Sequence, residues 1–436
     1  MASDVMVEAG YYELISFKIT SLIGAMGEGI ELNQIVTSWQ ISEGLHQTNV
    51  SGSAMVLDAE GVIRKLDNKG ILGEETITIK YKDFFGIERD DTYFVYGVRN
   101  VQPYDPTNEK MLSYRLDFTS MENFTASQKE VANSYKNMKI SDIAKEVYDE
   151  FFEGPKPFEV EETEGFHTLV IPRSSPHDAM NFLARRAYGG EDSMSNWSFY
   201  ETLDSFMFCT PDYAYNKYKG APPANNKFTT QKTMDDNTPG GQRVAQQTVS
   251  DIDYGSPINT IEEIKEGDYK RKVLNIDLLN RTTSYYDYEY KDTIQNNPLG
   301  DVEYNHLVPF IDQYMPNIRE DSIIKDFNTP GQVERAERLY PFYAETITSR
   351  RTFDRHMAKY TINCTIKGRN GLVPGMTLLI DADVQEVAKT PEIDQLRSGE
   401  YMITDITNAF FGDGYTQTLS ITKGGLKGGL ELVGGG

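Results

Sequence analysis

The sequence predicts a mainly β protein with α+β insertions, in which two similar barrel-like β-domains accompany one small α/β domain. The main observation is a β-pattern that occurs twice, about three hundred positions apart. The matched segments are Gly70–Ile79 with Gly371–Ile380, Tyr93–Val101 with Tyr401–Ala409, and Leu116 and Phe118 with Leu419 and Ile421. In each copy glycines mark a turn and lead into an apolar strand. Three matched strands in one order indicate two copies of one small β-domain.

A duplicated β-domain has a consequence for assembly. If a chain with two like domains formed a trimer, six similar units would surround one axis, so that a threefold object could fit a sixfold one. We therefore predict a pseudo-sixfold ring. The connection at 382–397 is longer than its counterpart in the first copy. It is expected to break the sixfold symmetry on one side and to face a threefold partner.

Changes in amino-acid composition and in hydrophobic periodicity divide the chain into six predicted regions. They are a first β-barrel-like domain (1–125), a small α/β domain (126–212), a polar exposed excursion (213–260), a mixed connecting region (261–350), a second β-barrel-like domain (351–423) and a glycine-rich tail (424–436). The clearest strands of the first domain are Ser53–Leu57, Thr76–Tyr81, Thr92–Val98 and Tyr114–Phe118.

The α/β domain is predicted from a change to helical periodicity. Apolar residues recur at helical spacing over 139–152, which predicts an amphipathic helix ended by Pro155 and Pro157. A second helix is expected from Ser175-Pro176, because serine can cap, proline suits the first helical position and Asp178 can close the cap. Two short strands, Trp197–Tyr200 and Phe206–Cys209, then form a predicted hairpin.

The region after the α/β domain is polar. Residues 214–257 are rich in Pro, Asn, Gln, Thr and Gly, so they are expected to bury little apolar surface. A strand is predicted at Val273–Leu279 and a helix at Gln332–Tyr340. The tyrosines that follow the strand fit either an interface or an ordinary half-buried strand; they are Tyr285, Tyr286, Tyr288 and Tyr290.

Composition excludes several classes of protein. The chain has 43 basic and 66 acidic residues and a net charge of −23, and no basic patch is visible, which argues against a DNA-binding surface. We expect no secretory signal and no membrane insertion, because no apolar run follows the amino terminus or reaches about 20 residues. Cys209 and Cys364 are too few for a disulfide framework and are expected to be core residues.

The sequence contains no motif for catalysis or for a cofactor. There is no Walker loop, dinucleotide fingerprint, zinc-protease pair or nucleophile elbow, so we expect no catalytic, cofactor-binding or metal-binding residue. The histidines are scattered; they are His46, His167, His177, His306 and His356. With so many acidic residues, carboxylate pairs carry almost no specificity. Arg185 and Arg186 could bind an anion, but capping of helix carbonyls or pairing with acidic neighbours is favoured.

The order of these segments resembles the contractile-tail hub family, which comprises phage baseplate hub proteins, their relatives in tail-like particles and the amino-terminal part of type VI secretion spike proteins. The passages that carry the resemblance are Leu116–Phe118 with Asn137–Ile143, Ser175–Ala187 with Trp197–Tyr200 and Phe206–Phe208, and Gly371–Gly375 with Ser398–Ile406. Each motif is weak alone, whereas their order is more specific. No lysozyme-like segment or long β-helical repeat follows the second barrel, which favours a phage or particle hub.

The resemblance implies a structural, non-enzymatic role. It implies a homotrimeric ring that joins a sixfold tail tube to a threefold central spike, contacts other baseplate proteins and lets the genome or the tape-measure protein pass through its channel. The protein would be part of the virion tail and would assemble in the host cytoplasm. Two alternatives stay open, a tail-associated cell-wall hydrolase and a carbohydrate-binding adhesin.

Overall fold

The structure is a computed structural model. It describes residues 8–21, 29–65, 71–105, 108–189, 196–218, 227–230, 238–253, 270–277, 281–289, 320–325, 350, 357, 361–382 and 397–423. The predicted helix at Gln332–Tyr340, the glycine-rich tail and residues 383–396 of the long connection lie outside these residues, as do His306 and His356.

The first β-domain is an antiparallel sheet in which buried side chains alternate with partly or fully exposed ones, as a sheet with one face on a core requires. In β5, for example, every second residue is buried. Its elements are β1 (Glu13–Ser21), β2 (Ile30–Glu31), β3 (Val36–Gly44), β4 (Ser51–Asp58), α1 (Val62–Lys65), β5 (Glu75–Lys82), β6 (Glu88–Asp105) and β7 (Asn108–Ser120). The hydrogen-bonded order is β3-β4-β7-β6-β5-β1-β2.

The α/β region follows and confirms the predicted helices and hairpin. Its elements are α2 (Met121–Ser127), β8 (Ser134–Met138), α3 (Ile140–Phe151), β9 (Phe158–Val160), β10 (His167–Val170), α4 (Pro176–Ala184), β11 (Ser198–Glu201) and β12 (Phe206–Cys209). The Ser175 side chain accepts a hydrogen bond from the Asp178 N–H, with Pro176 at the first helical position. Helices α3 and α4 and strands β11 and β12 enclose a separate apolar core.

The second β-domain contains elements from within the predicted excursion as well as strands from the carboxy-terminal part of the chain. They are α5 (Pro211–Tyr218), β13 (Lys227–Thr229), α6 (Pro239–Gln246), β14 (Val249–Asp253), β18 (Thr361–Lys367), β19 (Thr377–Asp381), β20 (Gly399–Phe411) and β21 (Gly414–Thr422). The order is β14-β18-β21-β20, with β19 on β20 and β13 on β19. A three-stranded sheet, β16-β15-β17, consists of β15 (Lys270–Asp277), β16 (Thr282–Glu289) and β17 (Glu320–Lys325).

The expectation of an exposed polar excursion over 213–260 is therefore wrong for its described part. Phe228 of β13 and Val249 of β14 are buried in the second β-domain core. Gln246 is fully buried and donates hydrogen bonds to the carbonyls of Lys367 and Gly368. The polar composition was misleading because these residues satisfy their polar groups through strand pairing and caps instead of water. The predicted domain boundaries themselves remain a prediction.

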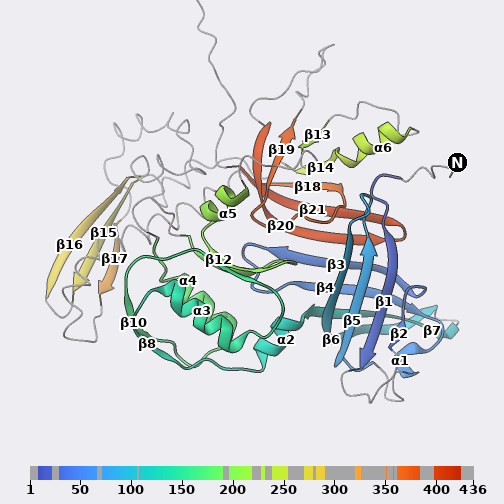
Figure 1. The fold of residues 1–436 in the computed structure, drawn as a ribbon, viewed down its shortest axis with the longest axis horizontal. Helices are drawn as coiled ribbons and strands as arrows, with labels where there is room; N and C mark the ends of the chain where they lie inside the picture. Colours follow the sequence, from blue (N-terminus) through green and yellow to red (C-terminus); the bar gives the residue numbers. More distant parts are fainter. Residues whose placement is uncertain are drawn as a thin grey trace, which may run out of the picture.

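The two β-domains lie next to each other in one continuous sheet. Figure 1 shows β20 and β21, in red, directly above β3 and β4, in blue. Backbone hydrogen bonds join the two domains through β20 and β3, which run antiparallel. The helices α3 and α4 lie to one side of this joint, beside the β11–β12 hairpin. The β20–β3 joint therefore sets how the two β-domains are placed relative to each other.

Candidate assembly surface

The two copies predicted from the sequence pair their strands in the same register. In the first copy Thr76 on β5 lies opposite Phe94 on β6. The corresponding residues of the second copy, Thr377 on β19 and Met402 on β20, also lie opposite each other. A one-residue slip would have put every side chain on the other face, so a shared register is a specific property of the two sheets.

The two copies also share an irregularity. The ladder between β6 and β7 shifts between Val95 and Gly97. The ladder between β20 and β21 shifts between Ile403 and Asp405, which are the matched positions. Bulges re-aim a strand and are built features of a sheet. The same bulge at the same place supports the duplication more strongly than the matched sequences alone.

The equivalence extends to two further strands in each copy, which the sequence comparison did not include. Strand β4 pairs with β7 as β18 pairs with β21, so that Ala54 faces Leu116 and Cys364 faces Leu419. Next to β4 lies β3, and next to β18 lies β14. The shared order is therefore β3-β4-β7-β6-β5 in the first copy and β14-β18-β21-β20-β19 in the second. Strand β14 corresponds to β3.

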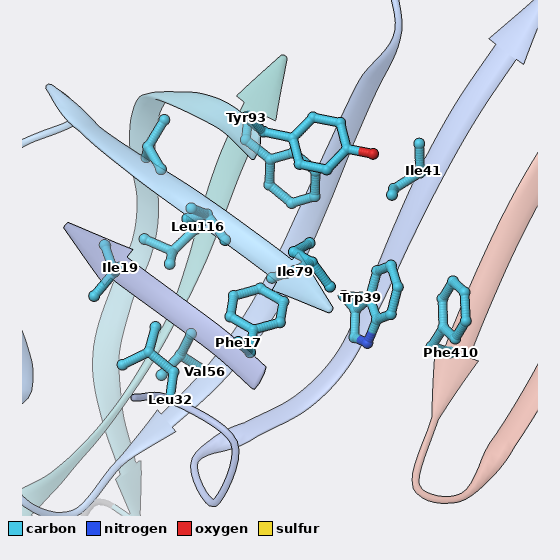
Figure 2. Packing of buried hydrophobic residues seen from close by; sticks show 14 of the residues in the cluster. Phe17, Ile19, Leu32, Trp39, Ile41, Val56, Ile79, Tyr93, Leu116 and Phe410 are labelled. Atoms are coloured by element: carbon cyan, nitrogen blue, oxygen red, sulfur yellow. The ribbon is translucent and has the colours of Figure 1, made fainter. Parts of the chain in front are cut away.

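The two copies are joined by an aromatic cluster. Across the β20–β3 pair, Phe410 lies opposite Trp39, and their rings stack with centroids 3.5 Å apart. Figure 2 shows these two rings side by side on neighbouring strands. The Tyr415 ring also stacks on Phe410. The rings of Tyr12 and Tyr81 form T-shaped contacts with Phe410. Phe410 and Trp39 are almost completely buried, so this contact belongs to the core of the first copy.

A second contact joins turns of the two copies. Tyr81 donates a hydrogen bond from its hydroxyl to Asn370 Oδ1, at 2.9 Å. The Asn370 N–H donates to Asp83 Oδ2 at 2.8 Å, and its side-chain amide donates to the Ile87 carbonyl. Three hydrogen bonds and a buried aromatic cluster fix the orientation of one copy on the other.

The α/β region meets this joint through buried carboxylates. Leu203 lies in the turn between β11 and β12, and its N–H donates a hydrogen bond to the Glu43 side chain on β3 at 2.8 Å. Glu201 accepts from the Val50 N–H and Ser120 Oγ and pairs with Lys156 at 2.6 Å. Burial raises the pKa of Glu43 to about 8, and burial also raises the pKa of Glu201. Both carboxyl groups have no exposed surface, and their hydrogen bonds join the two regions.

The structure does not bring the remaining candidates from the sequence together. His167 and His177 lie on β10 and α4, and burial lowers the pKa of each. Arg186 donates to the Phe182 carbonyl at 3.1 Å, which confirms the capping interpretation for this residue. Cys209 and Cys364 are buried free thiols, as expected for core residues. Within the described ranges no cluster of three His, Cys, Asp or Glu side chains could hold a metal ion.

Comparison with known proteins was informative only at the level of structure. No protein-family model and no curated protein sequence matches the chain. A tail protein from Neisseria meningitidis MC58 superimposes with a TM-score of 0.51 at 12% identity, covering 95% of this chain and 97% of that one. The 43 kDa tail protein of prophage MuSo2 from Shewanella oneidensis gives a TM-score of 0.51 at 11% identity, covering 94% and 98%. The chain has a tail-protein fold.

The tail-protein fold confirms the resemblance to the hub family at the level of the fold. It also confirms the mainly β class with α+β insertions. None of the helices in the described part of the chain is long and apolar enough to cross a membrane. The sequence did not predict β13, β14 or the β20–β3 joint. The aromatic residues of the joint, Trp39, Phe410 and Tyr415, were the available signal, because large aromatics are typical of packed interfaces.

Proposed function

We propose that the protein is the structural hub of the baseplate of a contractile phage tail or of a tail-like injection particle. It forms a homotrimeric ring in which the two β-domains of each chain alternate. Such a ring joins a sixfold tail tube to a threefold central spike, contacts other baseplate proteins and surrounds the channel for the genome or the tape-measure protein. Its place is the virion tail, after assembly in the host cytoplasm.

One observation carries this proposal. The two β-domains share strand order, register and a bulge, so that each chain offers two nearly equivalent units. A trimer of such chains presents six units to a sixfold partner while it keeps threefold symmetry for another. The tail-protein fold supports the same role.

The oligomeric state tests the proposal. Light scattering at micromolar concentration is expected to give three times the 49.4 kDa mass of the chain, and negative-stain images are expected to show a ring with a central hole. A monomer or a dimer under these conditions, also after addition of the spike protein, would contradict the proposed trimer.

We propose further that this role is non-enzymatic. The buried carboxylates Glu43 and Glu201 form hydrogen bonds with backbone and side-chain donors and have no exposed surface, which suits structural groups better than a hydrolytic pair. The purified protein is therefore expected to release no fragments from peptidoglycan. Turnover that is abolished by one carboxylate substitution would instead establish a tail-associated hydrolase.

A further inference from the structure

Strand β6 has a long open edge. Strand β7 pairs with β6 over most of its length, but β5 covers only the segment from Glu88 to Phe94. The turn before β5 still lies against Tyr96 and Gly97 through Gly73. From Val98 to Tyr104 no strand in the described part of the chain lies on the other side of β6. Three large side chains near this edge are half or more exposed: Tyr96 at 50%, Val101 at 51% and Tyr104 at 63%. An open edge of this length is a template for pairing with another strand.

The second copy shows what covers the corresponding edge. In β20, strand β19 covers only the segment from Gly399 to Met402, as β5 does in the first copy. The rest, from Asp405 to Phe411, pairs with β3 of the first copy. Within one chain, therefore, the free edge of β20 pairs with β3, the strand at the start of the shared order in the other copy. The matching edge of β20 is paired with β3, whereas the matching edge of β6 has no partner among the described strands of the same chain.

Strand β14 is the complementary end of the sheet. It corresponds to β3, and it stands last in the strand order, with β18 as its paired strand. Thr229 of β13 bridges only to Thr248, the residue before β14. Val249 faces Ile366 on β18 as Val36 faces Val56 on β4. Because β3 uses its other edge to pair with β20, β14 has the matching edge available for the same kind of pairing.

We propose that β14 of one chain pairs antiparallel with the open edge of β6 in a second copy of the chain. This contact repeats between chains the β20–β3 joint that exists within each chain, and it rests on the proposed hub function. It is heterologous, because different surfaces meet, and a repeated heterologous contact closes into a ring when the rotation allows. In a trimer, three joints within chains then alternate with three joints between chains.

The register of this contact follows from the equivalence of the copies. A bulge at Asn100, with a φ of 54°, adds one residue to β6 relative to β20. After this bulge Gln102 lies opposite Ser113 on β7. The equivalent pair in the second copy is Ala409 opposite Thr416 on β21. Gln102 thus takes the place of Ala409. On the other side, Asp253 faces Asn363 on β18 as Gln40 faces Ser53 on β4.

Within the chain, Ala409 lies opposite Gln40. The pair expected between chains is therefore Gln102 opposite Asp253.

Site-directed cross-linking tests the pairing. The double variant Gln102→Cys with Asp253→Cys is oxidised under native conditions and analysed on a denaturing gel without reductant. Residues opposite each other on antiparallel strands are close enough for a disulfide, so covalent dimers and trimers are expected, with at least half of the protein lost from the monomer band. The wild type, whose two cysteines are buried, is expected to stay monomeric on the gel.

Two controls make the result specific. Each single variant, Gln102→Cys or Asp253→Cys, is expected to give no covalent dimer, because the contact joins different surfaces. An efficient covalent dimer from a single variant would show a symmetric contact and overturn the proposal. Gln102→Cys with Thr283→Cys, at an exposed residue of β16, is expected not to cross-link. If light scattering shows a trimer but the Gln102–Asp253 pair does not cross-link, the pairing is wrong and the trimer stands. A protein that is monomeric throughout contradicts both.

A charge placed on the edge gives an independent test that does not depend on disulfide geometry. Lysine on an edge strand opposes pairing with another strand. Val101→Lys is therefore expected to abolish the trimer peak in light scattering, while the circular dichroism spectrum of the monomer stays unchanged. The matched control is Tyr285→Lys, at a residue that is 57% exposed on β16, and it is expected to keep the trimer. A trimer in Val101→Lys at wild-type abundance would overturn the inference.

Discussion

At the scale of single residues, Glu43 is the most unusual group. It is fully buried at the point where β3, β20 and the β11–β12 turn meet. Its Oε2 accepts the Leu203 N–H, whereas its Oε1 has no hydrogen-bond partner among the described residues. A buried carboxyl in such surroundings is favoured in its neutral form. Burial accordingly raises its pKa from 4.5 to about 8.

This raised pKa predicts how stability depends on pH. Between pH 4.5 and about pH 8 the folded protein keeps a proton on Glu43 that the unfolded chain releases. The contribution of this group to the free energy of unfolding is therefore fully present below pH 4.5 and falls as pH rises through the window, by at most about 1.4 kcal/mol per pH unit.

The variant Glu43→Gln is expected to lose this dependence, because glutamine carries no titrating proton. Urea unfolding at intervals from pH 5 to pH 8 measures the effect, and the exposed Glu60→Gln serves as the control that keeps the wild-type slope. Equal slopes for Glu43→Gln and the wild type would show that Glu43 is ionised in the folded protein.

The neighbouring pair Phe410 and Phe411 gives a second test at this scale. The Phe410 side chain is 1% exposed and stacks between Trp39 and Tyr415, whereas Phe411 is 76% exposed. Phe410→Ala is expected to lower the free energy of unfolding by about 3–5 kcal/mol, while Phe411→Ala changes it by less than about 0.5 kcal/mol. Denaturant unfolding measures both. Similar values for the two variants would mean that the joint between the β-domains contributes little to stability.

At the scale of elements, α4 shows what local sequence can specify. Its start was predictable because the cap, the proline and the acidic residue lie within four positions of one another. Ser175→Ala removes the hydrogen bond to the Asp178 N–H and is expected to cost about 1 kcal/mol. Thermal unfolding measures this loss, with Ser134→Ala at an exposed position of β8 as the control. No loss in Ser175→Ala would show that the cap is replaced by water.

The strands show where local sequence stops being sufficient. Strand β5 was predictable from its strict alternation, and the duplication was predictable from three matched segments. Strand β14 was not, because its five residues carry two aspartates and its partner β18 lies more than a hundred positions away. The bulge at Asn100 and the pairing of β3 with β20 depend on contacts that are distant in sequence, and these features form the candidate assembly surface.

At the scale of the whole molecule, the chain is one repeat unit of the proposed ring. It contains two equivalent sheets, one completed joint between them, and the two strand edges that the same joint would require at its ends. Heterologous contacts of this kind either close into a ring or continue as a filament. We expect the ring to close at three chains.

A cryo-electron microscopy reconstruction of the purified protein, calculated without imposed symmetry, tests this claim most directly. We expect a threefold ring in which six similar sheets alternate around a central lumen, with β14 of each chain beside β6 of the next. A particle in which the sheet edges of β6 and β14 face solvent, or in which the two β-domains of a chain do not occupy equivalent positions around the axis, would contradict it.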